Sequence, residues 1–304
     1  GRIDAAVDLL SKGLTIRPQY RAARFMLGTT LMETGHITRS AEHAEVLIAA
    51  RQNDPIGHGL MAFGLTQQAR IPEALDAFRA CIRCLPNNNA ALSNMLFAAL
   101  YGDHHDAPTV TQLHKKAGAA ISRIAIASGD RLEWGRLPAC RVPSKSGRLE
   151  AYPTESPPQL RIGYLSGDLK KHPVGYFLRA ILRHHDRSQI HATCYHIGAG
   201  KDELTEVLKS SSDSWCDASQ LSDDELLDRI RKDNIDLLVD LCGHTAGNRA
   251  GVLTRRAAPV QAMYLGYPCT SGLPNMDFVI SDHHLSPPEY DELYTEKVQR
   301  LENC

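Results

Sequence analysis

Asp168 and His172 are the residues whose types and spacing most directly suggest chemistry. They lie four positions apart in LRIGYLSGDLKKHPVGYF, just after the apolar segment 160–166. A carboxylate can accept a proton. An imidazole titrates near neutral pH, so it can act as a base or donate to a leaving-group oxygen. A turn or N-cap role is the alternative for Asp168, and capping or packing is the alternative for His172.

Two further loops have the composition of a binding site. GHTAGNR (243–249) follows the apolar segment 235–241, and LGYPCTSG (265–272) follows the segment 260–265. Glycines allow close backbone approach, a helix N-terminus after the first loop can hold an anion, and the amides of the second can bind a sugar or a phosphate. A plain turn is the competing account of the first loop. Since ligands bind beyond the carboxyl ends of strands in open α/β sheets, we expect these polar loops to form a site.

The elements that position these loops alternate apolar and amphipathic segments, which predicts a parallel sheet covered by helices on both faces. The predicted strands are 160–166, 191–197, 235–241, 260–265 and 278–281. Helices are predicted over 175–185 and 222–234, the second with Ser222 as its N-cap. This Rossmann-like lobe has no GxGxxG after its first strand, so the sequence gives little support for a dinucleotide site.

The N-terminal part repeats with a period of 34 residues. Matching sets are Gly1, Gly35 and Ala69; Ala6, Ser40 and Ala74; Leu14, Ile48 and Ile82; and Leu27, Met61 and Met95. This period is typical of the tetratricopeptide repeat, in which stacked helix pairs form an α-solenoid. The concave surface of such a solenoid usually binds protein segments, and a spacer or a homodimerisation element is the alternative.

Three regions follow from these patterns. We expect a tetratricopeptide repeat and helical region over 1–127, a linker over 128–158 that is rich in Pro, Gly and Ser, and the α/β lobe over 159–304.

Composition argues against several classes of partner. The net charge of −1 gives no general attraction to nucleic acid or to an anionic membrane, and no segment has the character of a signal peptide or a membrane span. The eight cysteines lack a disulfide-framework spacing. Cys81 and Cys84 form a CxxC in a helical stretch with no second pair, and the three HisHis pairs lack metal-ligand spacing. We expect a cytoplasmic protein with reduced thiols and no bound metal.

Taken together, the repeats and the motifs LRIGYLSGDLKKHPVGYFL, IDLLVDLCGHTAGNR and RRAAPVQAMYLGYPCTSGLPNMD resemble the O-linked N-acetylglucosamine transferase/Spindly family of nucleotide-sugar glycosyltransferases. The resemblance covers essentially the whole chain. It implies a two-lobed GT-B fold that transfers a sugar with inversion, without a metal, from a nucleoside diphosphate to Ser or Thr hydroxyls of proteins.

The resemblance also implies roles for single residues. Asp168 and His172 would lie at the reacting centre, and either one would handle the proton. Pro173 and Val174 would line the sugar pocket. The residues that would contact the donor sugar are Leu265, Gly266 and Pro268. His244 and Thr245 would lie near the interlobe cleft. Two positions depart from the family pattern: Cys269 replaces the usual Gly or Asn, and Tyr264 replaces the common Trp.

The function expected from this resemblance is a protein O-glycosyltransferase that uses UDP-GlcNAc. GDP-fucose is the alternative donor, and a tetratricopeptide protein-binding scaffold with a degenerate catalytic lobe is the alternative from another class. We expect the sequence to be a piece of a longer protein. We expect the family's second lobe to lie outside this sequence and the piece to be inactive alone, since a diphosphate leaving group needs positive charge or helix N-termini.

Overall fold

The computed structural model describes residues 2–102, 106–127 and 159–302. The chain divides into two compact units, Gly1–Ala117 and Gly118–Cys304, and the division falls inside the helix α7 (Ala107–Ala127). The predicted linker, 128–158, lies outside the described residues.

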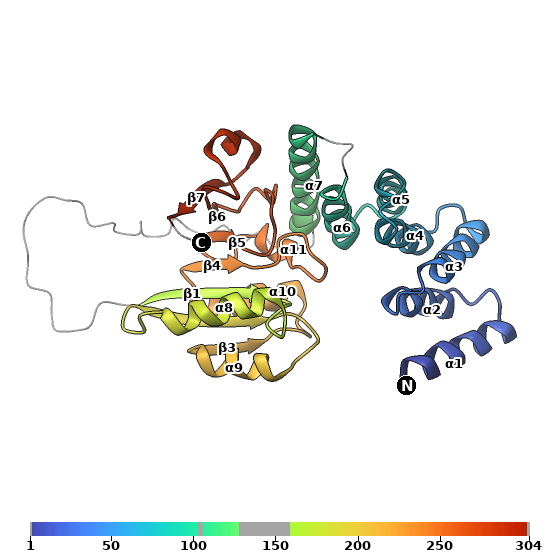
Figure 1. Ribbon diagram of the computed structural model, residues 1–304, viewed down its shortest axis with the longest axis horizontal. Helices are drawn as coiled ribbons and strands as arrows, with labels where there is room; N and C mark the ends of the chain where they lie inside the picture. The colour runs from blue at the N-terminus through green and yellow to red at the C-terminus, as the bar shows by residue number, and fades with distance from the viewer. Residues whose placement is uncertain (1, 103–105, 128–158, 303–304) are drawn as a thin grey trace, which may run out of the picture. The chain divides into compact units, whose positions relative to one another are not determined.

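The first unit consists of helices that follow one another in antiparallel pairs (Figure 1). They are α1 (Arg2–Ile16), α2 (Arg21–Glu33), α3 (Ile37–Ala50), α4 (Pro55–Gln67), α5 (Ile71–Cys84), α6 (Asn89–Ala99) and the first part of α7. Two of the three small residues at one phase of the repeat, Ser40 and Ala74, have no exposed surface, whereas Ala6 in the first helix is exposed. Leu27 and Met95, at another phase, are also buried, so the period predicted from the sequence marks the packed faces of the helices.

Asp54 ties two successive repeats together. Its side chain is the N-cap of α4, where Oδ1 accepts the N–H groups of Ile56 at 2.9 Å and Gly57 at 3.2 Å. Its other oxygen accepts the Arg21 guanidinium from the start of α2 at 2.6 Å. One buried carboxylate therefore fixes both a helix start and the contact between two repeats.

The second unit contains a seven-stranded parallel sheet in the order β3-β2-β1-β4-β5-β6-β7. The strands are β1 (Leu160–Ser166), β2 (Ile190–His196), β3 (Ser214–Asp217), β4 (Leu237–Asp240), β5 (Val260–Tyr264), β6 (Phe278–Asp282) and β7 (Lys297–Leu301). The five predicted strands are present, and β3 and β7 were not predicted.

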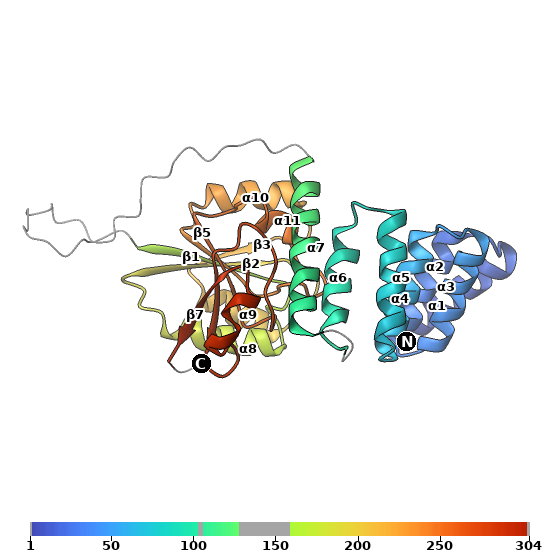
Figure 2. The ribbon, with the colours of Figure 1, turned by 90° about the horizontal axis from the view of Figure 1, so that it is seen from above.

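Helices cover both faces of this sheet. α8 (Pro173–His184) and α9 (Glu203–Ser211) lie on one side, and α10 (Asp223–Lys232) and the short α11 (Ala250–Leu253) lie on the other (Figure 2). A short 3₁₀ helix, η1 (Pro288–Leu293), precedes β7. Ser222 caps α10 as predicted, in a reciprocal capping box with Glu225. Apolar residues of β1, β2, β4, α8 and α9 form one buried core cluster.

The strand order creates a switch point between β1 and β4. From β1 the chain moves outward through β2 and β3, then returns to β4 beside β1 and moves outward in the other direction. Leu165 pairs with Asp240 at the carboxyl end of this junction. Ligands bind outside the carboxyl ends of strands at such points, so the loops after β1 and β4 flank the expected site.

An α-solenoid followed by a Rossmann-like lobe is therefore confirmed. In the described parts of the chain, no helix combines the length and the hydropathy that a membrane crossing requires.

Candidate functional site

The loop between β1 and α8 carries Asp168 and His172 at partly exposed positions. The buried Ser166 hydroxyl, at the end of β1, accepts the Asp168 N–H at 3.0 Å. The Asp168 side chain is 28% exposed and the His172 side chain 42% exposed, with 3.9 Å between Asp168 Oδ2 and His172 Nδ1. The structure thus brings the two predicted reacting groups together while leaving both open to solvent.

His172 also serves as the N-cap of α8. Its Nδ1 accepts the N–H of Val174 at 3.3 Å, and its extended backbone is typical of that position. A ring nitrogen that accepts this bond carries no proton, so the neutral imidazole then has its proton on Nε2. In this state Nε2 is a hydrogen-bond donor. If Nδ1 instead carries the proton and donates it to Asp168, Nε2 becomes available as a base.

The rest of this loop is held in place by contacts with the core and with α9. Leu169 is fully buried in the core, and its carbonyl accepts the Thr205 hydroxyl of α9 at 2.8 Å. Lys170 places its Nζ 3.9 Å from Asp168 Oδ1, on the oxygen opposite to His172. The Asp168 carboxylate therefore lies between the Lys170 ammonium and the His172 imidazole.

Pro173 and Val174, predicted to line the sugar pocket, begin α8 and differ in exposure. Pro173 is exposed, whereas Val174 is 6% exposed and packs in the core cluster. Their contact with a donor sugar remains a prediction. The side chain of Val174 has little exposed surface with which to make such a contact.

The loop after β4 is organised by the buried carboxylate of Asp240. Its oxygens accept the N–H groups of Cys242 at 3.1 Å and Gly243 at 2.8 Å. Burial raises the pKa of Asp240 to about 7, outweighing the two amides, which act in the opposite direction. Gly243 has a positive φ of 57°, and a Cβ at this position would lie 2.2 Å from the Cβ of Tyr267. Only glycine fits this turn.

His244 connects the β4 loop to the β5 loop. It is 1% exposed, its Nε2 lies 2.7 Å from the carbonyl oxygen of Ser271, and its ring meets the edge of Tyr267 at a centroid distance of 5.4 Å. Thr245 is half-buried and donates its hydroxyl to the carbonyl of Cys242 at 2.9 Å. The structure thus places His244 as a buried link between loops and Thr245 within its own turn.

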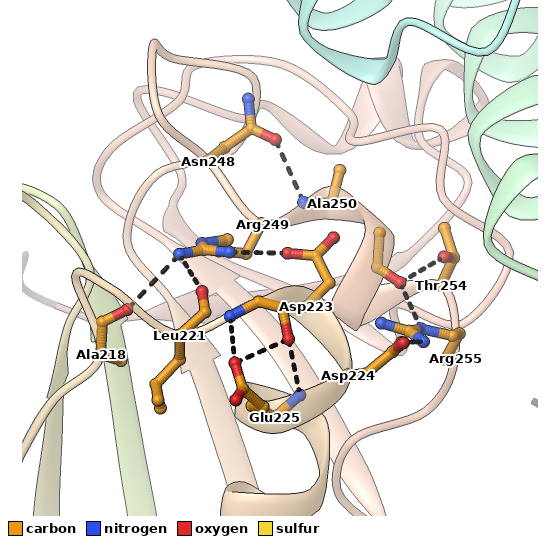
Figure 3. Close-up of polar contacts among 12 residues, drawn as sticks. Ala218, Leu221, Asp223, Asp224, Glu225, Asn248, Arg249, Ala250, Thr254 and Arg255 are labelled. Carbon is orange, nitrogen blue, oxygen red and sulfur yellow. Dashed lines mark hydrogen bonds and ion pairs between the residues drawn. The ribbon is translucent and has the colours of Figure 1, made fainter. Parts of the chain in front are cut away.

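The far end of GHTAGNR is anchored by Arg249. Its guanidinium donates to the carboxylate of Asp223 at 2.9 Å and to the carbonyl of Leu221 at 2.8 Å, and a longer contact of 3.4 Å reaches the carbonyl of Ala218 (Figure 3). These partners lie before and at the start of α10. The β4 loop is therefore held at one end by Asp240 and at the other by Arg249.

The LGYPCTSG loop packs tightly on the β4 loop. Leu265 adopts a positive φ of 67°, and a Cβ on Gly266 would lie 1.7 Å from the carbonyl oxygen of Leu241. Pro268 is exposed, and Cys269 is half-buried with a thiol pKa raised by burial to about 11. The predicted donor-contact residues Leu265, Gly266 and Pro268 therefore belong to a backbone that the β4 loop supports directly.

Cys242 joins the β1 and β4 loops across the switch point. Its sulfur accepts the N–H of Gly167 at 3.5 Å and lies 3.9 Å from the Ser166 hydroxyl. The loops after β1, β4 and β5 thus form one continuous edge that contains Asp168, His172 and the LGYPCTSG segment.

Glu296 was missed by the sequence analysis. It is buried at 5% exposure just before β7, and its oxygens accept hydrogen bonds from Thr270 and Ser271. No spacing or motif in YTEKVQ marks it, since a glutamate before a strand is ordinarily a solvated residue. In the described ranges, no group of three or more His, Cys, Asp or Glu side chains is arranged to hold a metal ion.

Comparison with protein families gives two matches. The model of glycosyl transferase family 41 matches residues 148–304, and a tetratricopeptide repeat model matches residues 1–62. The first match covers slightly more than half of the chain and includes every loop described above.

Curated relatives match parts of the chain. A rice protein named probable UDP-N-acetylglucosamine–peptide N-acetylglucosaminyltransferase SPINDLY is 31% identical over 232 residues, which is 75% of this chain and 23% of the rice protein. The UDP-N-acetylglucosamine–peptide N-acetylglucosaminyltransferase of Caenorhabditis elegans is 35% identical over 142 residues, 46% of this chain and 12% of its own. The chain therefore spans less than a quarter of these relatives' length.

A solved structure of a mutant O-GlcNAc transferase from Thermobaculum terrenum matches with a TM-score of 0.83 and 29% sequence identity. The match covers 99% of this chain and 54% of that one.

Proposed function

Because the chain belongs to glycosyl transferase family 41, we propose that it forms the repeat array and one catalytic lobe of a protein O-glycosyltransferase that uses UDP-GlcNAc. The single observation that carries this proposal is the Asp168–His172 pair at the β1–β4 switch point, inside the region matched by the family model. The names of the relatives support the donor and the peptide acceptor.

In the proposed reaction, the oxygen of a Ser or Thr hydroxyl attacks the anomeric carbon of the sugar. The bond from that carbon to the diphosphate oxygen breaks, the nucleoside diphosphate leaves with the bonding electrons, and the configuration inverts. The hydroxyl proton passes to a base. Nε2 of His172 fits this role when Nδ1 donates to Asp168, which then stabilises the imidazolium that forms.

His172 has to leave its capping bond for this step. The distance of 3.9 Å between Nδ1 and Asp168 Oδ2 is about 1 Å longer than a good hydrogen bond, so a small rotation of the imidazole exchanges the cap for the carboxylate. Catalytic hydrogen bonds are often long before substrate binds and tighten in the complex. We propose that the capped state is the resting state, with Nε2–H as a donor.

The donor sugar would lie against the LGYPCTSG loop. Leu265 and Gly266 present backbone that Leu241 supports, and Pro268 is exposed. His244 and Thr245 would act behind this surface, because the first is buried between the loops and the second is bonded within its own turn. Pro173 would complete the pocket from the start of α8.

The remaining parts of the proposal concern partners and location. The helical array would recruit polypeptide acceptors along its concave surface, as solenoids commonly do. We expect a cytoplasmic protein that acts without a metal or other cofactor and binds neither nucleic acid nor a membrane. A homodimer through the array is the remaining expectation.

The test is to incubate the full-length protein with a pool of Ser/Thr-rich peptides and either UDP-GlcNAc or GDP-fucose. Added mass is then measured on the peptides by mass spectrometry. A hexosamine adduct is the expected result. A fucose adduct would show that GDP-fucose is the donor. No adduct with either nucleotide sugar would contradict the proposal and favour a tetratricopeptide protein-binding scaffold.

A further inference from the structure

The buried carboxylate of Glu296 lies between β7 and the LGYPCTSG loop. Its Oε2 is 2.6 Å from the hydroxyl oxygen of Thr270. Its Oε1 accepts the N–H of Ser271 at 2.8 Å and also the hydroxyl of Ser271. The side chain reaches 25 and 26 positions back along the sequence, so it joins two segments that the chain brings together only on folding.

The two hydroxyls that donate to Glu296 also accept backbone N–H groups. Thr270 Oγ1 accepts the N–H groups of Gly272 at 3.2 Å and Thr295 at 3.1 Å, and the Thr295 hydroxyl lies 2.8 Å away. Ser271 Oγ accepts the N–H of Leu273 at 3.1 Å. Both hydroxyls donate to Glu296, so the side chain at this position faces donors on both of its oxygens.

This pattern requires a group that only accepts. A glutamine could direct its oxygen to Ser271, but its NH₂ would then face Thr270 Oγ1, which has no lone pair left. The opposite amide orientation would direct the NH₂ at the N–H of Ser271. Either way two donors face each other in a buried place, which is costly.

The contacts of Glu296 continue into the β4 loop. The carbonyl of Ser271, whose N–H and hydroxyl both bond to Glu296, is the partner of His244 Nε2 at 2.7 Å. His244 in turn follows the turn that Asp240 holds through Gly243. One chain of buried bonds thus runs from the start of β7, through the end of the LGYPCTSG loop, to the carboxyl end of β4.

We propose that Glu296 is a positioning residue that fixes the LGYPCTSG loop in the conformation that meets the donor sugar. That the loop meets a donor sugar rests on the proposed function. That Glu296 holds the loop in place follows from its hydrogen bonds with Thr270 and Ser271 alone. Glu296 acts through Thr270 and Ser271, and it touches no reacting atom.

The test compares Glu296→Gln with the wild type in the full-length protein, by two measurements. Hydrogen exchange followed by mass spectrometry reports on peptides that contain residues 270–273. We expect roughly tenfold faster exchange there in the variant, because a buried charge-assisted bond is lost. Steady-state kinetics should show the KM for UDP-GlcNAc raised by roughly tenfold, with kcat changed less than threefold and the KM for the acceptor peptide unchanged.

Asp236→Asn is the matched control. Asp236 also accepts a backbone N–H, that of Arg161 at 2.9 Å, but at the opposite end of β4. We expect its donor KM to equal that of the wild type, even if its melting temperature falls as far as that of Glu296→Gln. A general loss of stability would move both variants alike, whereas loss of loop positioning moves only the Glu296 variant.

Two results would overturn the inference. Unchanged exchange at 270–273 would show that Glu296 does not fix the loop. Faster exchange with an unchanged donor KM would show that the loop position is irrelevant to the donor. Failure of the proposed function itself would appear separately, as absence of sugar transfer by the wild type, and exchange at 270–273 would still decide whether Glu296 fixes the loop.

Discussion

The loop after β1 and the loops after β4 and β5 lie along the same edge of the sheet, yet they hold their polar groups in opposite ways. Asp168 and His172 are partly exposed and lie 3.9 Å apart, and the side chain of His172 accepts one weak capping bond at 3.3 Å. Asp240, His244 and Glu296 are each at most 5% exposed, and every one is bonded across a turn or between loops.

The difference separates two requirements of one site. A group that exchanges a proton needs room to change partners and contact with the medium, whereas a surface that recognises a sugar needs a fixed shape. The β1 loop supplies the first property, and the β4 and β5 loops supply the second. We therefore expect substitutions in the β1 loop to lower activity without unfolding the protein, and substitutions behind the other loops to lower stability first.

The largest expected effect is on catalysis. In the full-length protein, Asp168→Asn and His172→Ala should each lower kcat by a factor of about 10² to 10⁴, since each removes a partner in proton transfer. The melting temperature should stay within about 4 °C of the wild type, because both residues are partly exposed and only the weak capping bond of His172 is lost. Lys171→Ala, in the same loop and more than half exposed, is the control that should retain activity. Normal turnover in both variants would contradict the assignment.

A methyl group added at Gly243 should give the next largest effect. Gly243→Ala combines a Cβ placed 2.2 Å from that of Tyr267 with a positive φ, so it should lower the free energy of unfolding by about 3 kcal/mol. Gly247→Ala is a matched control, because Gly247 also has a positive φ but has nothing within 4 Å of its Cβ position. Gly247→Ala should lower the free energy of unfolding by about 1 kcal/mol. If urea unfolding showed the same loss of unfolding free energy in both variants, the close packing of Gly243 on Tyr267 would be unimportant for stability.

The smallest effect concerns pH. In the unfolded chain Asp240 ionises near 3.8, while in the folded protein it keeps its proton to about pH 7. This group therefore favours folding below pH 4, and its contribution is lost as the pH rises to 7. Between pH 5 and pH 8 the loss should be on the order of 2 kcal/mol.

The measurement is urea unfolding of the wild type and of Asp240→Asn, followed by Trp215 fluorescence with Trp134 replaced by Phe. Asparagine does not titrate, so the difference in unfolding free energy between the two proteins should change by that amount between pH 5 and pH 8. A constant difference would mean that Asp240 is ionised throughout this range.

Most of the sheet was predictable because its central strands carry continuous apolar residues. β3 and β7 were not, since SWCD is only four residues long and KVQRL alternates exposed and half-buried positions at the edge of the sheet. Edge strands are defined by their neighbour rather than by their own composition. The capping motif before α10 was readable because its residues interact within one turn.

The site was predictable to the level of loops. A motif after a strand places Asp168, His172 and the LGYPCTSG segment at the carboxyl edge. Whether a side chain faces the ligand or the core depends on contacts that are distant in sequence. Val174 packs among core residues, His244 bonds to Ser271, and Glu296 accepts from Thr270, none of which a local pattern encodes.

The pairing of β1 with β4 has a consequence for how the protein forms. Gly167 and Cys242, which touch across the switch point, are 75 positions apart in the sequence. Closing such a distant contact is slow, and it requires that β4 has already been synthesised. We therefore expect β1, β2 and β3 to assemble first on the ribosome, with one flank of β1 open. The edge that holds Asp168 beside the sugar-binding loops would then be among the last parts of the lobe to form, so a nascent chain would have part of its sheet before it has a site.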